Sequence, residues 1–180
     1  IATGPFNAAG ITIDDELYVW GSGSNYVTGV YYATDYNAPH KVDVAGVSWR
    51  DIKIGGQTVH AIDTQDILWG WGNRGNWSIG NGGSIDVRVP QQIPIGLSVE
   101  SIATGNFASF VIAENGQVYA AGRKEYNGLG LEDSVTSIFT EVHGLESRSI
   151  FAGYGNAFAI AGALSSPNFW TNFSGQTEIL

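Results

Sequence analysis

The chain has 180 residues, of which 43% are hydrophobic and 14% are charged, and 17 acidic residues against 8 Lys and Arg give it a net charge of −9. This length suits one ordinary domain with a real core, and the acidic balance argues against a nucleic-acid partner, which requires clustered positive charge. The lack of cysteine excludes disulfides and thiolate metal sites, and no apolar run is long enough to predict membrane insertion.

One unit is copied along the chain about every fifty residues, which is the period of a repeat architecture. Each copy opens with Ile-x-x-Gly, at residues 1–4, 52–55, 102–105 and 150–153. The later landmarks are Gly21, Gly72 and Gly122, then Gly29, Gly80 and Gly130, then Pro39, Pro90 and Thr140. We therefore predict a single repeat array over 1–180, with units at 1–51, 52–101 and 102–149 and a partial unit at 150–180.

Each unit is predicted to hold about four short antiparallel strands. After a first strand that ends at the opening Gly, second strands are expected at 9–13, 59–63, 109–113 and 157–161, third strands at 17–20, 68–71 and 118–121, and last strands near 41–44, 92–95 and 140–142. Tight turns at 14–15, 65–66 and 115–116 separate the second and third strands. For the Asn-Gly at 115–116 we expect positive φ at both central residues.

This repeated order of strands and turns predicts an all-β fold made of propeller blades with four antiparallel strands each, either an open arc or part of a larger propeller. The third strands, such as residues 17–20, are apolar on both faces, which indicates a blade covered by neighbours on both sides. No window shows sustained helical periodicity. We expect Trp20 and Trp71 to lie in the core between blades, with a binding role as the alternative.

The order of these motifs resembles the repeat of the regulator-of-chromosome-condensation family. Residues 17–21, 67–72 and 118–122 match the central part of that repeat, and residues 127–130 resemble its Gly-Gln-Leu-Gly turn. The family's His, three residues after the opening Gly, is replaced by Asn7, Thr58, Ala108 or Asn156. The resemblance implies a seven-bladed propeller, of which this chain would supply about three and a half units, and a role in protein contact rather than catalysis.

An open arc of blades would leave two apolar faces in water, which proteins avoid. Three arrangements would cover them: further units in a longer polypeptide, self-association of two copies through the open blade ends, or docking on another protein. We therefore expect a protein partner, an oligomer or a larger assembly.

The candidate binding residues are aromatic side chains in the loops after the second Gly landmark. The first loop, within residues 25–37, carries Tyr26, Tyr31, Tyr32 and Tyr36, and the matching loop of the second unit carries Trp77. Clustered tyrosines give a large, rigid contact area with a polar tip, and such residues dominate protein interfaces. The alternative is that they cover the edge of their own blade.

Chemistry beyond binding has little support in the residues. His60 lies in an apolar strand in a different phase from His40 and His143, so a histidine triad is not expected. The carboxylates of residues 14–16 occupy a hairpin turn and lack the spacing of a calcium loop. Motifs of phosphate loops, zinc proteases and serine hydrolases are missing. We expect no metal, no cofactor and no catalytic residue.

The sequence thus favours a non-enzymatic protein-binding or assembly module. The low charge and the loops rich in Gly, Asn and Tyr favour a structural component of a virion or cell-surface assembly, and hence an extracellular or virion location over a cytoplasmic one. The alternative function is a carbohydrate-binding or carbohydrate-cleaving propeller, of which cleavage would need two facing carboxylates.

Overall fold

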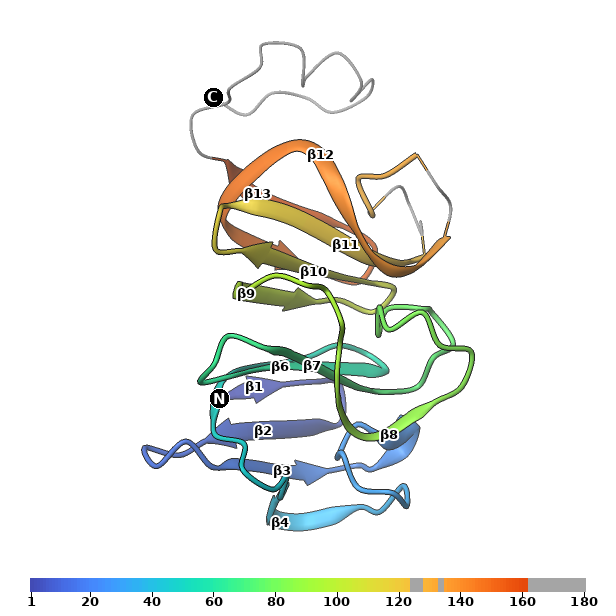
Figure 1. Ribbon diagram of the computed structural model, residues 1–180. Coiled ribbons are helices and arrows are strands. Elements are labelled where there is room, and N and C mark those ends of the chain that lie inside the picture. The colour runs from blue at the N-terminus through green and yellow to red at the C-terminus, as the bar shows by residue number, and fades with distance from the viewer. Residues whose placement is uncertain (124–127, 133–134, 162–180) are drawn as a thin grey trace.

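The computed structural model describes residues 1–123, 128–132 and 135–161. The sheets formed by these residues are stacked in chain order, from the N-terminal unit at the bottom of Figure 1 to strands β12 and β13 at its top. Most of the expected partial unit at 150–180 lies outside the described residues, and the division of the chain at 51, 101 and 149 stays a prediction.

The first two units each form one sheet of four antiparallel strands, as predicted. The first sheet contains β1 (Ala2–Thr3), β2 (Asn7–Ile11), β3 (Leu17–Gly21) and β4 (Tyr36–Lys41). The second contains β5 (Trp49–Ile54), β6 (Thr58–Asp63), β7 (Leu68–Gly72) and β8 (Val87–Gln92). Among the described residues the only helical element is the 3₁₀ turn η1 (Ser24–Tyr26). The prediction of an all-β propeller fold is therefore confirmed.

The third sheet has five strands because one long strand serves two units. It contains β9 (Val99–Thr104), β10 (Ala108–Ala113), β11 (Gln117–Arg123), β12 (Val135–Ala152) and β13 (Ala157–Ala161). The first part of β12 pairs with β11, and its second part pairs with β13. The last strand of one unit thus continues directly into the first strand of the next.

Two sequence predictions need correction. The fourth strands begin earlier than expected, at Tyr36 and Val87, so that Pro39 and Pro90 lie inside them. Proline is accepted there because β4 and β8 are the edge strands of their sheets, and an edge residue need not donate a ladder hydrogen bond.

The hairpin at 115–116 is also of another type than predicted. Gly116 N–H donates to the Ala113 carbonyl, and of the two predicted central residues only Gly116 has positive φ. The turn is therefore centred on residues 114 and 115 and is followed by a left-handed residue, a common three-residue hairpin. Asp15 and Asp66 take the same left-handed position in the first and second units.

The core lies between the sheets. Trp71 is fully buried, as predicted, and packs edge-to-face on Trp49, which also contacts Trp69. Trp20, the counterpart of Trp71 in the first unit, is only partly buried. The difference follows from position, because no described unit precedes the first sheet.

The opening glycines mark where neighbouring sheets come closest. A Cβ on Gly55 would overlap the carbonyl oxygen of Gly105, and one on Gly105 would meet the carbonyl oxygen of Gly153 at 2.5 Å. The repeated Gly is therefore required by close backbone approach between successive units.

Candidate functional site

The propeller has two unlike faces, which we name the loop face and the turn face. The loop face is formed by the turns between first and second strands (residues 5–6, 56–57, 106–107 and 154–155) and by the long loops between third and fourth strands (22–35 and 73–86). Backbone hydrogen bonds hold each long loop on the adjacent turn, as in Ser22 N–H to Phe6 and Asn73 N–H to Gln57. The turn face, on the left of Figure 1, carries the hairpin turns.

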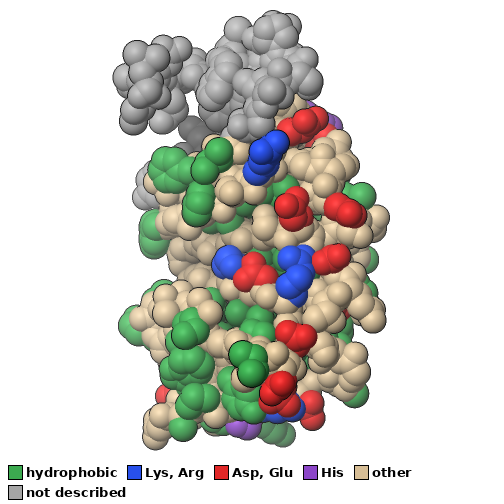
Figure 2. Space-filling model, turned by 90° about the vertical axis from the view of Figure 1, so that its left-hand side faces the viewer, with side chains coloured by type: hydrophobic (Ala, Val, Ile, Leu, Met, Phe, Trp, Pro, Cys, Tyr) green, Lys and Arg blue, Asp and Glu red, His purple; other side chains and the backbone are tan. Residues whose placement is uncertain are grey.

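The turn face holds most of the described acidic side chains. They belong to the hairpin turns and to the segments where one unit passes to the next: Asp14, Asp15, Glu16, Asp43, Asp66, Glu100, Glu114 and Glu146. Figure 2 shows this side of the molecule, where acidic side chains form a column together with Lys and Arg. Two of the cations are paired there, Lys41 with Glu16 and Arg50 with Asp66.

The loop face uses its carboxylates to shape the long loops. Gly23 N–H donates to Asp35 Oδ1 at 2.8 Å, and Arg74 N–H donates to Asp86 Oδ1 at 3.1 Å. These contacts occupy equivalent positions of the first and second units. Each aspartate therefore closes its own loop at the same position of its unit.

The first loop is anchored on the second unit. The Trp71 indole N–H donates to the Val27 carbonyl at 3.0 Å, and a Cβ on Gly29 would lie 3.1 Å from Trp71 Nε1. Val27 and Thr28 are buried in this contact. The anchored part of the loop fixes the direction in which the following tyrosines leave the surface.

Tyr26 and Trp77 occupy the same position in the two loops and share two unusual features. Both have a φ of 60°, a left-handed conformation that costs a bulky side chain roughly 1 kcal/mol or more. Both rings lie under an arginine: Arg88 is 5.0 Å from the Tyr26 ring, and Arg74 is 5.0 Å from the Trp77 ring. Repetition of a strained aromatic beneath a guanidinium marks this position as a candidate site.

The other predicted tyrosines divide into two groups. Tyr31 and Tyr32 are 57% and 75% exposed and touch edge-to-face at 5.3 Å. Arg88 also lies 5.0 Å from the Tyr31 ring, so the structure brings Tyr26 and Tyr31 together around Arg88, with Tyr32 beside Tyr31. Tyr36 instead stacks on His40 at 3.9 Å within β4, where it covers its own strand.

Sequence reasoning missed the two arginines. Arg88 belongs to β8, the edge strand of the second unit, and reaches the loop of the first unit because that loop docks forward on the next sheet. The scattered positions of the arginines in the sequence gave no sign of this contact. The one feature of the sequence that could have indicated a role for Arg88 was its position two residues before the Pro90 landmark.

His60 fixes the second loop rather than forming a reactive site. Its Nε2 lies 3.0 Å from the Ile79 carbonyl, which only accepts, and its Nδ1 lies 3.1 Å from Thr104 Oγ1 in the third unit. Burial lowers the pKa of His60 to about 4, and the bond to the Ile79 carbonyl opposes this shift. The ring is therefore neutral at ordinary pH and joins two units and a loop.

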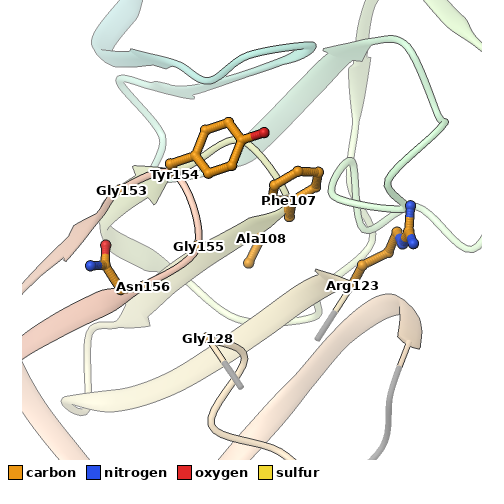
Figure 3. A pocket seen from close by; sticks show the side chains of 8 residues that line it. All are labelled: Phe107, Ala108, Arg123, Gly128, Gly153, Tyr154, Gly155 and Asn156. Carbon is orange, nitrogen blue, oxygen red and sulfur yellow. The ribbon is translucent and has the colours of Figure 1, made fainter. Parts of the chain in front are cut away.

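A shallow hollow with a cavity volume of only about 10 Å³ lies on the loop face, between the third unit and the turn at 154–155. Figure 3 shows the Phe107 and Tyr154 rings beside it, and they touch edge-to-face at 5.0 Å. Among the described residues no carboxylate lines this hollow, and Glu114 is the one described carboxylate that lines a second hollow on the turn face. The described lining of both hollows thus lacks the two facing carboxylates of a carbohydrate-cleaving site.

Within the described ranges, no group of three or more His, Asp or Glu side chains is placed to hold a metal ion. Over the same ranges, no helix is both long enough and apolar enough to cross a bilayer.

No family model matches the chain, but curated proteins do. Over 160 residues it is 31% identical to the human E3 ubiquitin-protein ligase HERC2, an alignment that covers 84% of this chain and 3% of HERC2. Over 160 residues it is 28% identical to the mitochondrial RCC1 domain-containing protein RUG3 of Arabidopsis thaliana, which covers 83% of this chain and 36% of RUG3. The chain thus spans a minor part of each relative.

Solved structures share the fold. Prp20p of Saccharomyces cerevisiae superposes with a TM-score of 0.80 at 20% identity, covering 94% of this chain and 44% of Prp20p. Human WBSCR16 superposes with a TM-score of 0.74 at 21% identity, covering 83% of this chain and 41% of WBSCR16. In both cases the matched region is less than half of the larger chain.

Proposed function

This chain belongs to the regulator-of-chromosome-condensation repeat family as a partial array of its propeller units, and we propose that it is a non-enzymatic module that binds another protein through its loop face. The observation that carries the proposal is the contact of Arg88 with Tyr26 and Tyr31, with Tyr32 packed on Tyr31. Aromatic side chains and arginine dominate protein interfaces, and here the tyrosines are held on an anchored loop beside an arginine of β8.

Relatives support protein contact as the role of this fold. The structure of Prp20p was described together with its binding to Gsp1p and histones, and yeast RCC1 (Prp20) was crystallised bound to Kap60. The ligase activity named for HERC2 belongs to a protein of which this chain matches 3%. We therefore take over the binding role and no enzymatic one.

A second part of the proposal concerns β13, the last described strand of the array. Phe158 and Ile160 on β13 are 65% and 61% exposed, whereas Phe110 and Ile112, their counterparts on β10, are buried. The same strand positions are covered wherever another unit follows. We propose that another unit of this repeat covers this face, in the same chain or in a second one.

The virion or cell-surface role and the extracellular location stay proposals supported by composition. The chain combines a charged fraction of 14% with 25 glycines and no cysteine, which suits a rigid assembly part. Proteomic analysis of purified virions or of the secreted fraction of the source would test this, and exclusive recovery from the cytoplasm would contradict it.

The binding role is tested by a paired substitution on the loop face. Tyr31→Ala combined with Tyr32→Ala should remove proteins that the immobilised wild-type chain retains from its source extract, as quantified by mass spectrometry. Ile13→Ala is the matched control, because Ile13 is 99% exposed on the turn face. Equal retention by all three proteins would contradict the assignment of the loop face.

A further inference from the structure

We propose that the Arg88 cluster, defined as Arg88 with Tyr26 and Tyr31, binds a carboxylate on an acidic segment of the partner protein. This inference rests on the proposed protein-binding function and specifies the chemistry of its partner. It starts from the donors of the Arg88 guanidinium. Among the described residues, none of the hydrogen bonds or ion pairs uses them.

Arg50 on the turn face shows the contrast. Its guanidinium donates to the Val99 carbonyl at 2.8 Å and to the Glu100 carbonyl at 3.1 Å, and it pairs with Asp66 at 2.8 Å. Its donors are therefore used inside the chain, where they join the second and third units. Arg88 has the same chemistry, but in the part of the chain that the structure describes its guanidinium lies over aromatic rings and enters no hydrogen bond or ion pair, so its donors are available to another molecule.

The two tyrosines prepare Arg88 for recognition. The guanidinium carbon is 5.0 Å from both ring centroids, and contact with two rings restricts a side chain that otherwise has many rotamers. An arginine restricted in this way loses less entropy when it binds. Its planar set of donors matches the two oxygens of a carboxylate.

The surrounding charges favour an acidic partner on this face. Asp35 and Asp86, which lie in the two long loops, each accept a backbone N–H, whereas Arg74 lies over Trp77 as Arg88 lies over its tyrosines. On the turn face, the acidic side chains would repel the same partner. Since exposed charges more than about 10 Å apart are screened at 0.1 M salt, the charges nearest Arg88 matter more to a partner there than the net charge of −9.

A protein segment fits these features better than a nucleic acid. A nucleic acid is held through many phosphates and requires a broad set of cations, whereas the described part of the loop face carries few arginines, among them Arg74 and Arg88. One or two carboxylates next to apolar side chains would pair with Arg88 and pack on the exposed rings of Tyr31 and Tyr32. The occupant is therefore an Asp- or Glu-containing segment with adjacent apolar residues.

The test is a random-peptide display selection on the immobilised full chain. We expect the recovered peptides to be enriched in Asp and Glu beside apolar residues. For a selected peptide, Arg88→Gln should weaken binding about tenfold or more, because an ionised hydrogen-bonded pair is lost. Arg88→Lys should weaken it less, since charge remains without the planar donors. Arg148→Gln removes the same charge from an exposed site remote from the loop face and should leave affinity unchanged.

The outcomes separate this inference from the proposed function. One outcome is a set of peptides that is not enriched in Asp or Glu and that binds the Tyr31→Ala, Tyr32→Ala variant more weakly but binds Arg88→Gln as well as the wild type. This outcome would overturn the proposed recognition of a carboxylate and would still support protein binding. Failure to recover any peptide would count against both. Equal losses in Arg88→Gln and Arg148→Gln would show a general charge effect and would also overturn the inference.

Discussion

At the scale of single residues, buried polar side chains decide how the loops of this propeller are held. His60 contacts the Ile79 carbonyl in the second loop and Thr104 in the third unit, and Thr58 and Ser78 hydroxyls meet at 2.6 Å nearby. These groups satisfy one another away from water, which a buried polar group requires. The second loop is thereby tied to the strands beneath it.

The buried His60 predicts a specific dependence of stability on pH. In the unfolded chain it takes up a proton below its ordinary pKa of 6.5, but in the folded chain its pKa is lowered to about 4. The unfolded state therefore binds more protons between these values, so the free energy of unfolding falls as the pH drops from 6.5 to 4. The expected loss is roughly 3 kcal/mol.

His60→Gln should remove this component while keeping a neutral, hydrogen-bonding side chain. Denaturant unfolding of both proteins at pH 7 and pH 4.5 measures it. The variant should lose less stability than the wild type between these pH values. Parallel losses would show that His60 is not the group responsible.

The exposed tyrosines give a second prediction at this scale. If Tyr31 and Tyr32 serve a partner, replacing both with Ala should leave the melting temperature nearly unchanged, because over half of each side chain is already in water. Thermal unfolding followed by circular dichroism would measure this. A fall of several degrees would support the alternative, in which they cover their own blade.

At the scale of strands and loops, the spacing of the units depends on the opening glycines. Gly55→Ala should destabilise the fold by about 2 kcal/mol or more, because the added Cβ meets the backbone of Gly105 and cannot be relieved by a side-chain rotation. Gly10→Ala is the matched control in β2, where the nearest atom would be 3.7 Å away. Chemical denaturation compares them, and equal stability of the two variants would contradict the close approach of units.

The sequence predicted these elements well where the pattern is local. The repeated Gly and Pro landmarks and the apolar segments between them were enough to predict the four-stranded sheets and the burial of Trp71. They were not enough for β4 and β8, because the pairing of Tyr36 with Gly21 and of Val87 with Gly72 depends on tertiary contact across a long loop. The same reason explains the missed Arg88, whose partners Tyr26 and Tyr31 lie in the preceding unit.

At the scale of the whole molecule, the described part of the array presents an apolar face at β13, its last described strand. Phe151 pairs with Phe158 in the strand register, and both side chains are largely exposed beside Ile160. Such a face resembles the buried surfaces between the earlier units. This likeness supports the proposal that another unit of the repeat covers the face.

Light scattering of the purified 180 residues tests this face. We expect species larger than the 19.2 kDa monomer, and we expect Phe158→Asp combined with Ile160→Asp to reduce them. Ile13→Asp on the turn face is the control and should not. A fully folded wild-type monomer at micromolar concentration would contradict the proposed coverage.

The most direct measurement of the central claim is a map of which face contacts protein in the source. A photo-crosslinking amino acid is placed at position 31 or 154 on the loop face, or at position 13 or 115 on the turn face. We predict discrete crosslinked proteins from positions 31 and 154 and none from 13 and 115. Crosslinks that arise equally from both faces, or from the turn face alone, would contradict a protein-binding loop face.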